Sequence, residues 1–481
     1  MITLNCCAKI ECEPTSQWPC GFASLKSRSE QLQGLWAAIT SGIPASQRRG
    51  DKNQHSAMNI SATKSPAVVI LGPPFPRSGT ASVMHTQIEF YRSRGYVTVF
   101  VCVATHCSLV ETNPDWQNIR DGFRELGADQ TVFAVIDNRR FTILKYVTWV
   151  EHLFRGTALD WFVFTGRSAC LPDDVIRTIR QLPVALIHVN HVSTLGFAQR
   201  LVRQVVPSDG RVPMILETHD IVAEFLHGRG EINPWTHGHD TVDRLLRSEL
   251  SYLRKSEVLV HLSVDDFNFF KSRLPDKRHV LVMPTVDETF VSKIHAADQS
   301  STDSVDLLFV GTSSDPNRAA IKWFFEQVWP RIADRGYRVK IVGQVDLLVR
   351  TSLPDIYQAY RSYFVGPIAI EELRSTYRAA RCVFAPMVSG TGISIKTIEA
   401  LALGKPFVGT SKAYRGMPMD LILGAGLQAH DSPEDFADAI VRALSEEQVA
   451  AAASSRAYSG VFSKEAAFAS RDEALRLATT P

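Results

Sequence analysis

The sequence predicts an α/β protein with two doubly wound domains in tandem. Short apolar runs recur along the chain and suit strands that are buried on both faces of a parallel sheet. Segments with apolar residues at helical spacing separate these runs. The alternation lapses once, in the polar stretch of residues 292–304, and then resumes. We therefore expect a surface linker between two domains.

Size and charge limit the classes of protein that fit. The chain has 481 residues, 45% of them hydrophobic, and a formal net charge of +2. Residues 1–65 hold 7 basic and 4 acidic side chains, so the rest of the chain carries a net charge of −1. Affinity for nucleic acid depends on clustered excess Lys and Arg, and a nucleic-acid binder with a broad basic face is therefore disfavoured.

Residues 1–65 are predicted to form a flexible extension, because they are mostly polar from residue 24 onward. Four cysteines crowd its start without the spacing of a zinc site, and we expect them to be reduced; they are Cys6, Cys7, Cys12 and Cys20. The start also lacks the pattern of a secretory signal. No apolar run approaches the ~18 residues needed to cross a bilayer. These observations favour a cytoplasmic protein.

The first domain, residues 66–295, begins with the apolar run of residues 67–71, which ends at Gly72-Pro73-Pro74 and predicts a buried strand. The strands predicted after it are residues 97–101, 131–136, 185–189, 214–217, 258–260 and 280–283. The predicted helices are residues 81–94, 172–181, 195–205, 242–254 and 265–273.

The second domain, residues 305–481, repeats the alternation. Its predicted strands are residues 307–310, 339–342, 363–365, 382–385, 407–409 and a short segment near Leu427. Its predicted helices are residues 319–332, 370–378, 395–403 and 433–444, and an Ala-rich helix at residues 463–478 is expected to pack back on the first domain. Two such domains place a ligand cleft between the carboxyl edges of their sheets.

A glycine-rich segment after the strand at residues 382–385 carries the clearest chemistry. Its glycines let the backbone approach a ligand closely, and the following helix N-terminus favours a phosphate. The candidate phosphate-binding residues are Gly390, Thr391, Gly392, Ile393 and Ser394, and Ser394 is also expected to cap the helix.

Two charged residues follow on the same helix. Lys396 would add a full positive charge one turn from the phosphates. Glu399 lies three residues further on and therefore near Lys396 on the helix surface. A carboxylate at that position can accept two hydrogen bonds from the vicinal hydroxyl groups of a ribose.

This segment resembles the donor-binding signature of the group 1 glycosyltransferases with the GT-B fold, numbered family 4 in the usual classification. The matching residues are Gly392, Lys396, Glu399-Ala400-Leu401-Ala402 and Gly404-Lys405-Pro406, with further matches at Leu308-Phe309-Val310-Gly311, Pro316-Asn317, Val342-Gly343 and Phe364-Val365-Gly366. The resemblance implies two Rossmann-like domains facing across a cleft. It extends from about Val68 to the C-terminus and is stronger in the second domain.

By this resemblance, Glu399 binds the nucleotide ribose, residues 392–394 bind the diphosphate and Lys396 stabilises the charge on the leaving group. Thr391 stands where the family often has a first glutamate, which indicates a variant donor pocket. A dinucleotide fingerprint would require a third glycine at Ile395, so a nicotinamide enzyme is disfavoured.

Further candidates lie at other strand ends. By the same resemblance, His219 is a candidate for donor contact or proton handling, with Asp220 orienting it. The segment from His188 to His191 is a weaker candidate for the acceptor side.

Two loops supply the remaining candidates. Gly311 and Thr312 would face the donor, although a loop or capping role fits them equally well. Gly79 and Arg77 lie in the first loop, where Arg77 could bind phosphate or the segment could be a proline turn. No spacing indicates a metal site.

We therefore expect a hexosyltransferase-type enzyme of polysaccharide biosynthesis. It would move a sugar from a nucleotide diphosphate-sugar to a polysaccharide, glycan or glycolipid acceptor, with retention, without a metal and without a cofactor. Peripheral contact with the inner face of the membrane is compatible with a lipid-linked acceptor. Two alternatives stay open: a nucleotide-sugar epimerase on the same fold, and a non-catalytic GT-B partner subunit. The sequence identifies neither the sugar, the base nor the acceptor.

Overall fold

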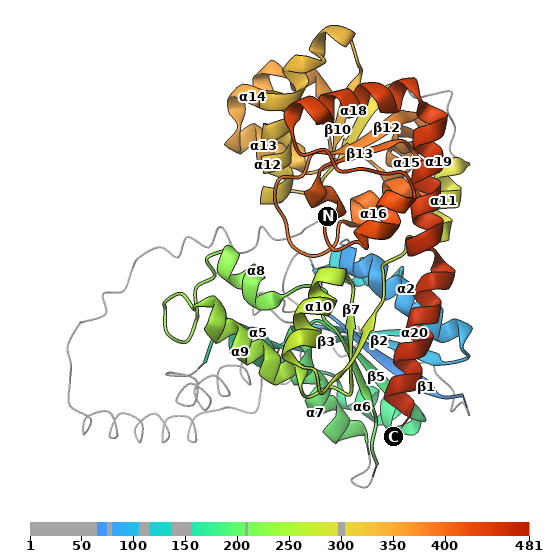
Figure 1. Cartoon of the computed structure of the whole chain (residues 1–481). Coiled ribbons are helices and arrows are strands. Elements are labelled where there is room, and N and C mark those ends of the chain that lie inside the picture. The colour runs from blue at the N-terminus through green and yellow to red at the C-terminus, as the bar shows by residue number, and fades with distance from the viewer. Residues whose placement is uncertain are drawn as a thin grey trace, which may run out of the picture. The chain divides into compact units, whose positions relative to one another are not determined.

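The computed structural model describes residues 65–74, 79–104, 116–136, 156–206, 210–296 and 304–480. These residues lie within one compact unit of the chain and contain two sheets (Figure 1). The predicted alternation of strands and helices in two doubly wound α/β domains is confirmed. Residues 1–64 of the predicted extension, with its four cysteines, and Arg77 lie outside the described residues.

The first sheet has the order β4-β3-β2-β1-β5-β6-β7-β8. All of its strands pair in parallel except β4, which is antiparallel to β3. Its strands are β1 (Ala67–Gly72), β2 (Val97–Val103), β3 (Gln130–Ile136), β4 (Ala169–Cys170), β5 (Val184–Asn190), β6 (Met214–Glu217), β7 (Val258–His261) and β8 (Arg278–Leu281). The side chains of β1 are fully buried, which explains its continuous apolar run.

Nine α-helices lie within residues 79–295 of the described chain, and the last of them packs on the core of the second domain. They are α2 (Gly79–Ser93), α3 (Trp116–Arg124), α5 (Ala158–Ser168), α6 (Asp173–Gln181), α7 (Leu195–Val205), α8 (Val222–Gly228), α9 (Val242–Leu253), α10 (Val264–Arg273) and α11 (Glu288–His295). The linker prediction at residues 292–304 is wrong at its start, because α11 continues to His295. Asp287 caps α11 by accepting a hydrogen bond from the Thr289 backbone at 2.8 Å.

The second sheet is parallel throughout and has the order β11-β10-β9-β12-β13. Its strands are β9 (Val305–Val310), β10 (Val339–Val342), β11 (Phe364–Gly366), β12 (Ala380–Ala385) and β13 (Phe407–Gly409). The segment predicted near Leu427 forms only an isolated bridge between Gly409 and Ala429. The helices are α12 (Asp315–Trp323), α13 (Val345–Ser352), α14 (Pro354–Ala359), α15 (Ile370–Ala379), α16 (Ile395–Ala402), α17 (Met419–Gly424), α18 (Pro433–Ser445) and α19 (Glu447–Ala457).

The helix predicted at residues 319–332 is in fact three helical segments. It starts earlier, with α12 at Asp315 and with Pro316 in its first turn, which suits a residue that lacks a backbone donor. A π-helical turn (Phe324–Val328) and a 3-10 turn (Trp329–Arg331) follow. Pro330 cannot supply an α-helical hydrogen bond, which accounts for the end of the regular helix.

The last helix, α20 (Lys464–Thr479), packs on the first sheet. Phe468, Ala474 and Ala478 lie in the same core as Val68 and Ile70 of β1. Figure 1 shows this helix in red beside the elements of the first sheet. Among the helices of the described residues, none is both long and apolar enough to cross a membrane.

Candidate functional site

The loop between β12 and α16 has the backbone geometry that its glycines allow. The φ angles of Gly390 and Gly392 are +132° and +61°, which other residues rarely adopt. A Cβ atom on Gly392 would lie only 2.2 Å from Asp220 Oδ1. Glycine at this position therefore permits a close approach between the loop of the second domain and the turn after β6 of the first.

In the part of the chain that the structure describes, no side chain caps the start of α16. Ser394 occupies the N-cap position, but its side chain does not accept a hydrogen bond from the helix backbone. Instead, Ser394 Oγ accepts from Thr397 Oγ1 at 3.0 Å, so the predicted capping by this side chain is wrong. Uncapped N–H groups at a helix N-terminus favour an anion.

Gly79 lies beside the same helix. A Cβ atom on Gly79 would lie 2.8 Å from Ile395 Cγ1, so the start of α2 contacts the start of α16. Ile393, which precedes this contact in the loop, is partly buried against the core of the second domain. The structure thus brings Gly79 to the glycine-rich loop.

Lys396 is held by the first strand and helix of the second domain. Its Nζ donates a hydrogen bond to Asn317 Oδ1 and lies 4.7 Å from the centre of the Phe309 ring. Asn317 Nδ2 in turn donates to the Thr312 backbone oxygen at 2.9 Å, and a Cβ atom on Gly311 would lie 3.2 Å from that nitrogen. Gly311, Thr312 and Lys396 are therefore joined through Asn317.

Glu399 lies close to Lys396 on α16. The Tyr377 hydroxyl donates to Glu399 Oε2 at 3.4 Å. Burial raises the pKa of Glu399 to about 7, although Tyr377 and Lys396 oppose this rise. Burial and the charge of Arg415 lower the pKa of Lys396 to about 7. Both groups can thus change their charge near neutral pH when a ligand enters.

Arg415 is a candidate that the sequence patterns did not indicate. It follows the 3-10 turn Ser411–Tyr414, and its Nε donates to the Thr391 backbone oxygen at 3.1 Å. A Cβ atom on Gly390 would lie 3.2 Å from the Arg415 Cζ atom. The guanidinium group therefore lies against the glycine-rich loop. Its only sequence signal is its place after β13, the strand beside β12.

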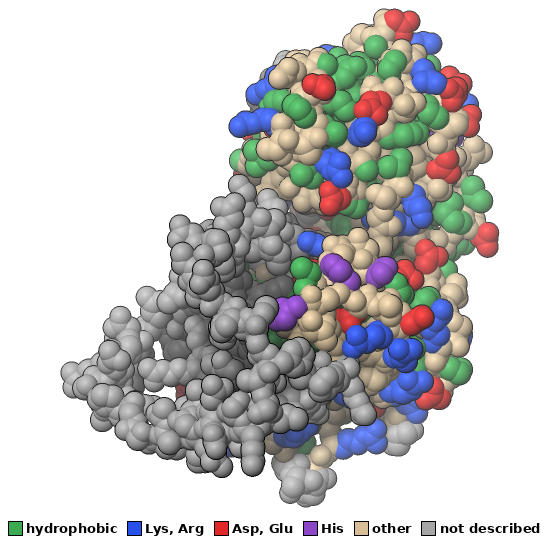
Figure 2. Space-filling view, turned by 90° about the vertical axis from the view of Figure 1, so that its left-hand side faces the viewer, with side chains coloured by type: hydrophobic (Ala, Val, Ile, Leu, Met, Phe, Trp, Pro, Cys, Tyr) green, Lys and Arg blue, Asp and Glu red, His purple; other side chains and the backbone are tan. Residues whose placement is uncertain are grey.

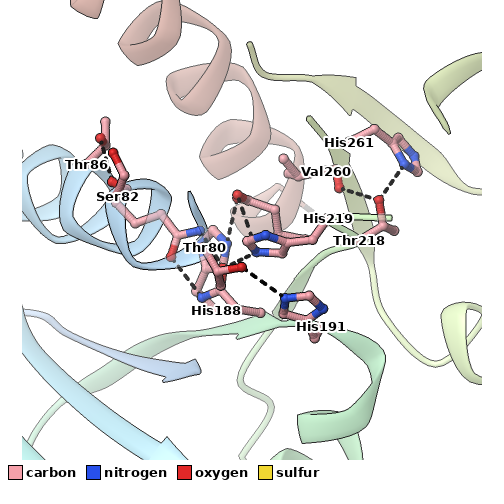
Figure 3. A network of polar contacts seen from close by, with 12 residues as sticks. Thr80, Ser82, Thr86, His188, His191, Thr218, His219, Val260 and His261 are labelled. Carbon is pink, nitrogen blue, oxygen red and sulfur yellow. Dashed lines mark hydrogen bonds and ion pairs between the residues drawn. The ribbon is translucent and has the colours of Figure 1, made fainter. Parts of the chain in front are cut away.

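His219 stands at the end of β6 in an unusual backbone conformation. Its φ angle is +59°, which is rare for residues other than glycine. Its ring stacks on that of His191, with ring centres 4.2 Å apart (Figure 3). His219 Nε2 lies 2.9 Å from Asn190 Oδ1. Asn190 therefore orients this imidazole through Nε2, and an orienting role of Asp220 stays a prediction.

The hydrogen bonds of Asn190 fix the position of the proton on His219. Asn190 Nδ2 donates to the Leu71 backbone oxygen at 3.1 Å and to Gln87 Oε1, so Asn190 Oδ1 must be the acceptor. His219 Nε2 therefore carries the proton, and Nδ1 is an acceptor in the neutral ring. Burial lowers the pKa of His219 to about 4, which keeps the ring neutral at physiological pH.

Asp220 faces the second domain instead. Its Oδ1 lies against Gly392, as described above. Burial, with the nearby Asp266, raises the pKa of Asp220 to about 7, and the charge of Arg415 opposes this rise. Asp220 is therefore a carboxyl group that can take up or release a proton near neutral pH.

His188 belongs to the interior, and the structure does not support its prediction as an acceptor-side residue. It is 2% exposed, and the Tyr91 hydroxyl donates to its Nδ1 at 2.9 Å. Its Nε2 lies 3.2 Å from Glu217 Oε2. His191 lies against the start of α2, with its Nε2 3.5 Å from Thr80 Oγ1.

Two observations bear on the class of ligand that the site can bind. No group of three metal-ligating side chains occurs within the described ranges. Around the second sheet, the face in Figure 2 shows Lys and Arg interspersed with Asp, Glu and hydrophobic side chains, without a broad basic surface. The positive charge at the site thus comes from individual side chains, Lys396 and Arg415.

Two comparisons concern the sequence of this chain. Residues 304–446 match the family model of the glycosyl transferases group 1. No curated protein matches the sequence as a relative.

Solved structures share the fold. Sucrose-phosphate synthase from Thermosynechococcus elongatus is 15% identical, with a TM-score of 0.55 over 85% of this chain and 98% of its own. HepE from Anabaena, solved in complex with UDP-glucose, is 13% identical, with a TM-score of 0.56 over 85% of this chain and 99% of its own. Trehalose 6-phosphate synthase from Burkholderia multivorans is 14% identical, with a TM-score of 0.53 over 86% and 98%. The chain shares the GT-B fold of these structures, and its residues 304–446 are similar to the group 1 glycosyl transferases.

Proposed function

We propose that this glycosyltransferase of the group 1 type transfers a sugar from a nucleotide diphosphate-sugar to a glycan or lipid-linked acceptor, with retention and without a metal ion. The observation that carries the proposal is a single contact region. There the glycine-rich loop, with Lys396 and Arg415 beside it, meets the turn of His219 and Asp220.

The donor diphosphate would bind at the start of α16. The uncapped backbone donors there favour an anion, and Lys396 and Arg415 add two positive charges. These charges would neutralise the departing diphosphate, which is the part that a metal ion plays in other transferases. Glu399 would accept hydrogen bonds from the ribose. The UDP-glucose complex of HepE makes a UDP-sugar the first donor to test.

The transferred sugar would lie against the turn after β6. His219 offers a neutral Nδ1, which can accept a hydrogen bond from a hydroxyl group of the sugar or the acceptor. Asp220, with its raised pKa, could exchange a proton with the same region. The acceptor would be a glycan or a lipid-linked sugar, and a lipid-linked acceptor would bring the protein to the inner face of the membrane.

Calorimetry with UDP-glucose tests the donor site. Glu399→Ala should weaken binding by at least about tenfold, because it removes hydrogen bonds to a charged group. Glu372→Ala on α15 is a matched control, since that side chain is exposed, and it should leave affinity unchanged. Equal affinity of wild type and Glu399→Ala would refute the ribose assignment.

Two further assays separate the alternatives. Incubation of the protein with the donor alone would yield an epimer if the chain were a nucleotide-sugar epimerase. Turnover of donor and acceptor by the purified chain would exclude a non-catalytic subunit, which the Thr391 substitution would otherwise favour. Anomeric configuration of the product, read by NMR, decides between retention and inversion.

A further inference from the structure

A buried ion pair links the end of the chain to the first sheet. Arg471, on α20, donates from Nη1 to Glu217 Oε2 at 2.9 Å. The Arg471 side chain is 4% exposed and that of Glu217 is 0% exposed. Breaking such a pair leaves an uncompensated charge in the interior. Glu217 is the last residue of β6 and precedes His219 by two residues. The buried ion pair therefore lies next to the turn that carries His219.

Glu217 also faces two histidines. Its Oε2 accepts a hydrogen bond from His188 Nε2 at 3.2 Å. Its Oε1 lies 4.0 Å from His219 Nε2 and has no hydrogen-bond partner among the described residues. The carboxylate thus stands between His188, His219 and Arg471.

The charges of this cluster oppose one another. Burial by itself would raise the pKa of Glu217, but Arg471 and His188 lower it well below its ordinary value. Burial lowers the pKa of His219, while the Glu217 carboxylate raises it and the Arg471 charge lowers it. The positive charge of Arg471 therefore opposes the rise in the pKa of His219 that the Glu217 carboxylate causes.

We propose that Arg471 is a positioning residue for His219: by balancing the Glu217 carboxylate, it keeps the His219 ring neutral, with Nδ1 able to accept a hydrogen bond. The inference rests on the proposed role of His219. Without Arg471, the uncompensated Glu217 carboxylate would favour protonation of His219. Nδ1 of a protonated His219 could no longer accept a hydrogen bond. The titratable groups around the cluster are Tyr91 from α2, His188 and His191 at β5, Asp220, and His261 from β7. Burial lowers the pKa of His261, and the Glu217 charge opposes this fall.

The test follows His219 directly in the full-length protein by NMR of ¹⁵N-labelled histidine, with His219→Gln to assign its signal. Wild type should show the proton on Nε2 and no titration of His219 between pH 5 and 8. Arg471→Gln should raise the titration midpoint by at least about one pH unit. Arg471→Lys, which keeps the charge, should restore most of the wild-type behaviour. An unchanged midpoint in folded Arg471→Gln overturns the proposal.

Two further variants test whether the effect on His219 comes from the loss of the Arg471 charge. Arg476 lies on the same helix but is exposed and pairs with Glu473, so Arg476→Gln should leave His219 unchanged. Glu217→Gln/Arg471→Gln removes both charges and should return the ring to neutrality. A raised midpoint in the double variant overturns the link through Glu217, and the double variant also serves if Arg471→Gln does not fold.

Kinetics separate this inference from the proposed function. In Arg471→Gln, the acid limb of the kcat/KM profile should move to higher pH by the same amount as the ring titration. A shifted ring titration with an unchanged profile supports the electrostatic link and refutes the role of His219 in transfer.

Discussion

Donor binding should place a proton on Lys396. In the free protein, burial and the charge of Arg415 lower the pKa of Lys396 to about 7, so the side chain is only partly charged at neutral pH. A bound diphosphate favours the ammonium form, because it places negative charge beside a buried amine. Binding and protonation are therefore linked, and donor affinity should fall as the pH rises.

The size of the effect follows from that pKa. The charged fraction of Lys396 falls from about three quarters at pH 6.5 to about one thirtieth at pH 8.5. The diphosphate of a nucleotide-sugar keeps both negative charges over this range. If the complex holds Lys396 fully charged, the affinity for UDP-glucose falls about 25-fold, which is about 1.9 kcal/mol. At pH 7.5, binding should take up about 0.8 proton.

Calorimetry in buffers of different ionisation enthalpy measures both quantities. Lys396→Arg is the informative variant, because its guanidinium stays charged and should abolish the proton uptake of this site. Any slope that remains in this variant belongs to Glu399 or Asp220, whose pKa values also lie near 7. Lys322→Arg, at an exposed position of α12, is the matched control and should behave as wild type. A wild-type affinity that changes less than about threefold, without proton uptake, would refute the reasoning.

Three further predictions concern the loop, the second cation and the last helix. Gly392→Ala should weaken UDP-glucose binding at least about tenfold and lower Tm, because it adds about 1–2 kcal/mol of backbone strain and a Cβ atom 2.2 Å from Asp220 Oδ1; unchanged binding would contradict the contact. Arg415→Gln should weaken binding about 10- to 150-fold by loss of a charge-assisted hydrogen bond, and an unchanged dissociation constant in calorimetry would remove it from the site. Phe468→Ala should cost about 3–5 kcal/mol in urea unfolding, because this ring packs in the core of the first sheet beside Phe90; a cost below about 1 kcal/mol would contradict that packing.

The fold was largely predictable because its strands are buried on both faces. The strand run at residues 67–71 shows no polar interruption, and the structure places it at the centre of the first sheet. Helices with apolar residues on several sides were missed. In α5, for example, residues such as Leu159, Phe164 and Gly166 are all buried, so no amphipathic pattern marks it. Its capping box at Thr157 and Asp160 was the available signal.

The candidate site was predictable only where its residues are close in sequence. Residues 390–399 form one loop and one helix, so their pattern is visible in the chain. Asn190, which sets the tautomer of His219, comes from another strand. Arg415 and Arg471 reach the site through folding alone, and neither belongs to a local motif. Partners brought together by strand order cannot be identified from spacing.

The position of Arg471 also bears on how the chain is made. Glu217 and Arg471 are 254 residues apart, so at roughly 5–20 residues per second Glu217 is synthesised roughly 13–50 s before its cation. During translation, the nascent first domain must therefore hold this carboxylate without its counterion. The first sheet can complete its interior only after α20 has been synthesised and has left the ribosome. A nonsense codon before α20 would therefore leave Glu217 without its cation in the domain that is synthesised first.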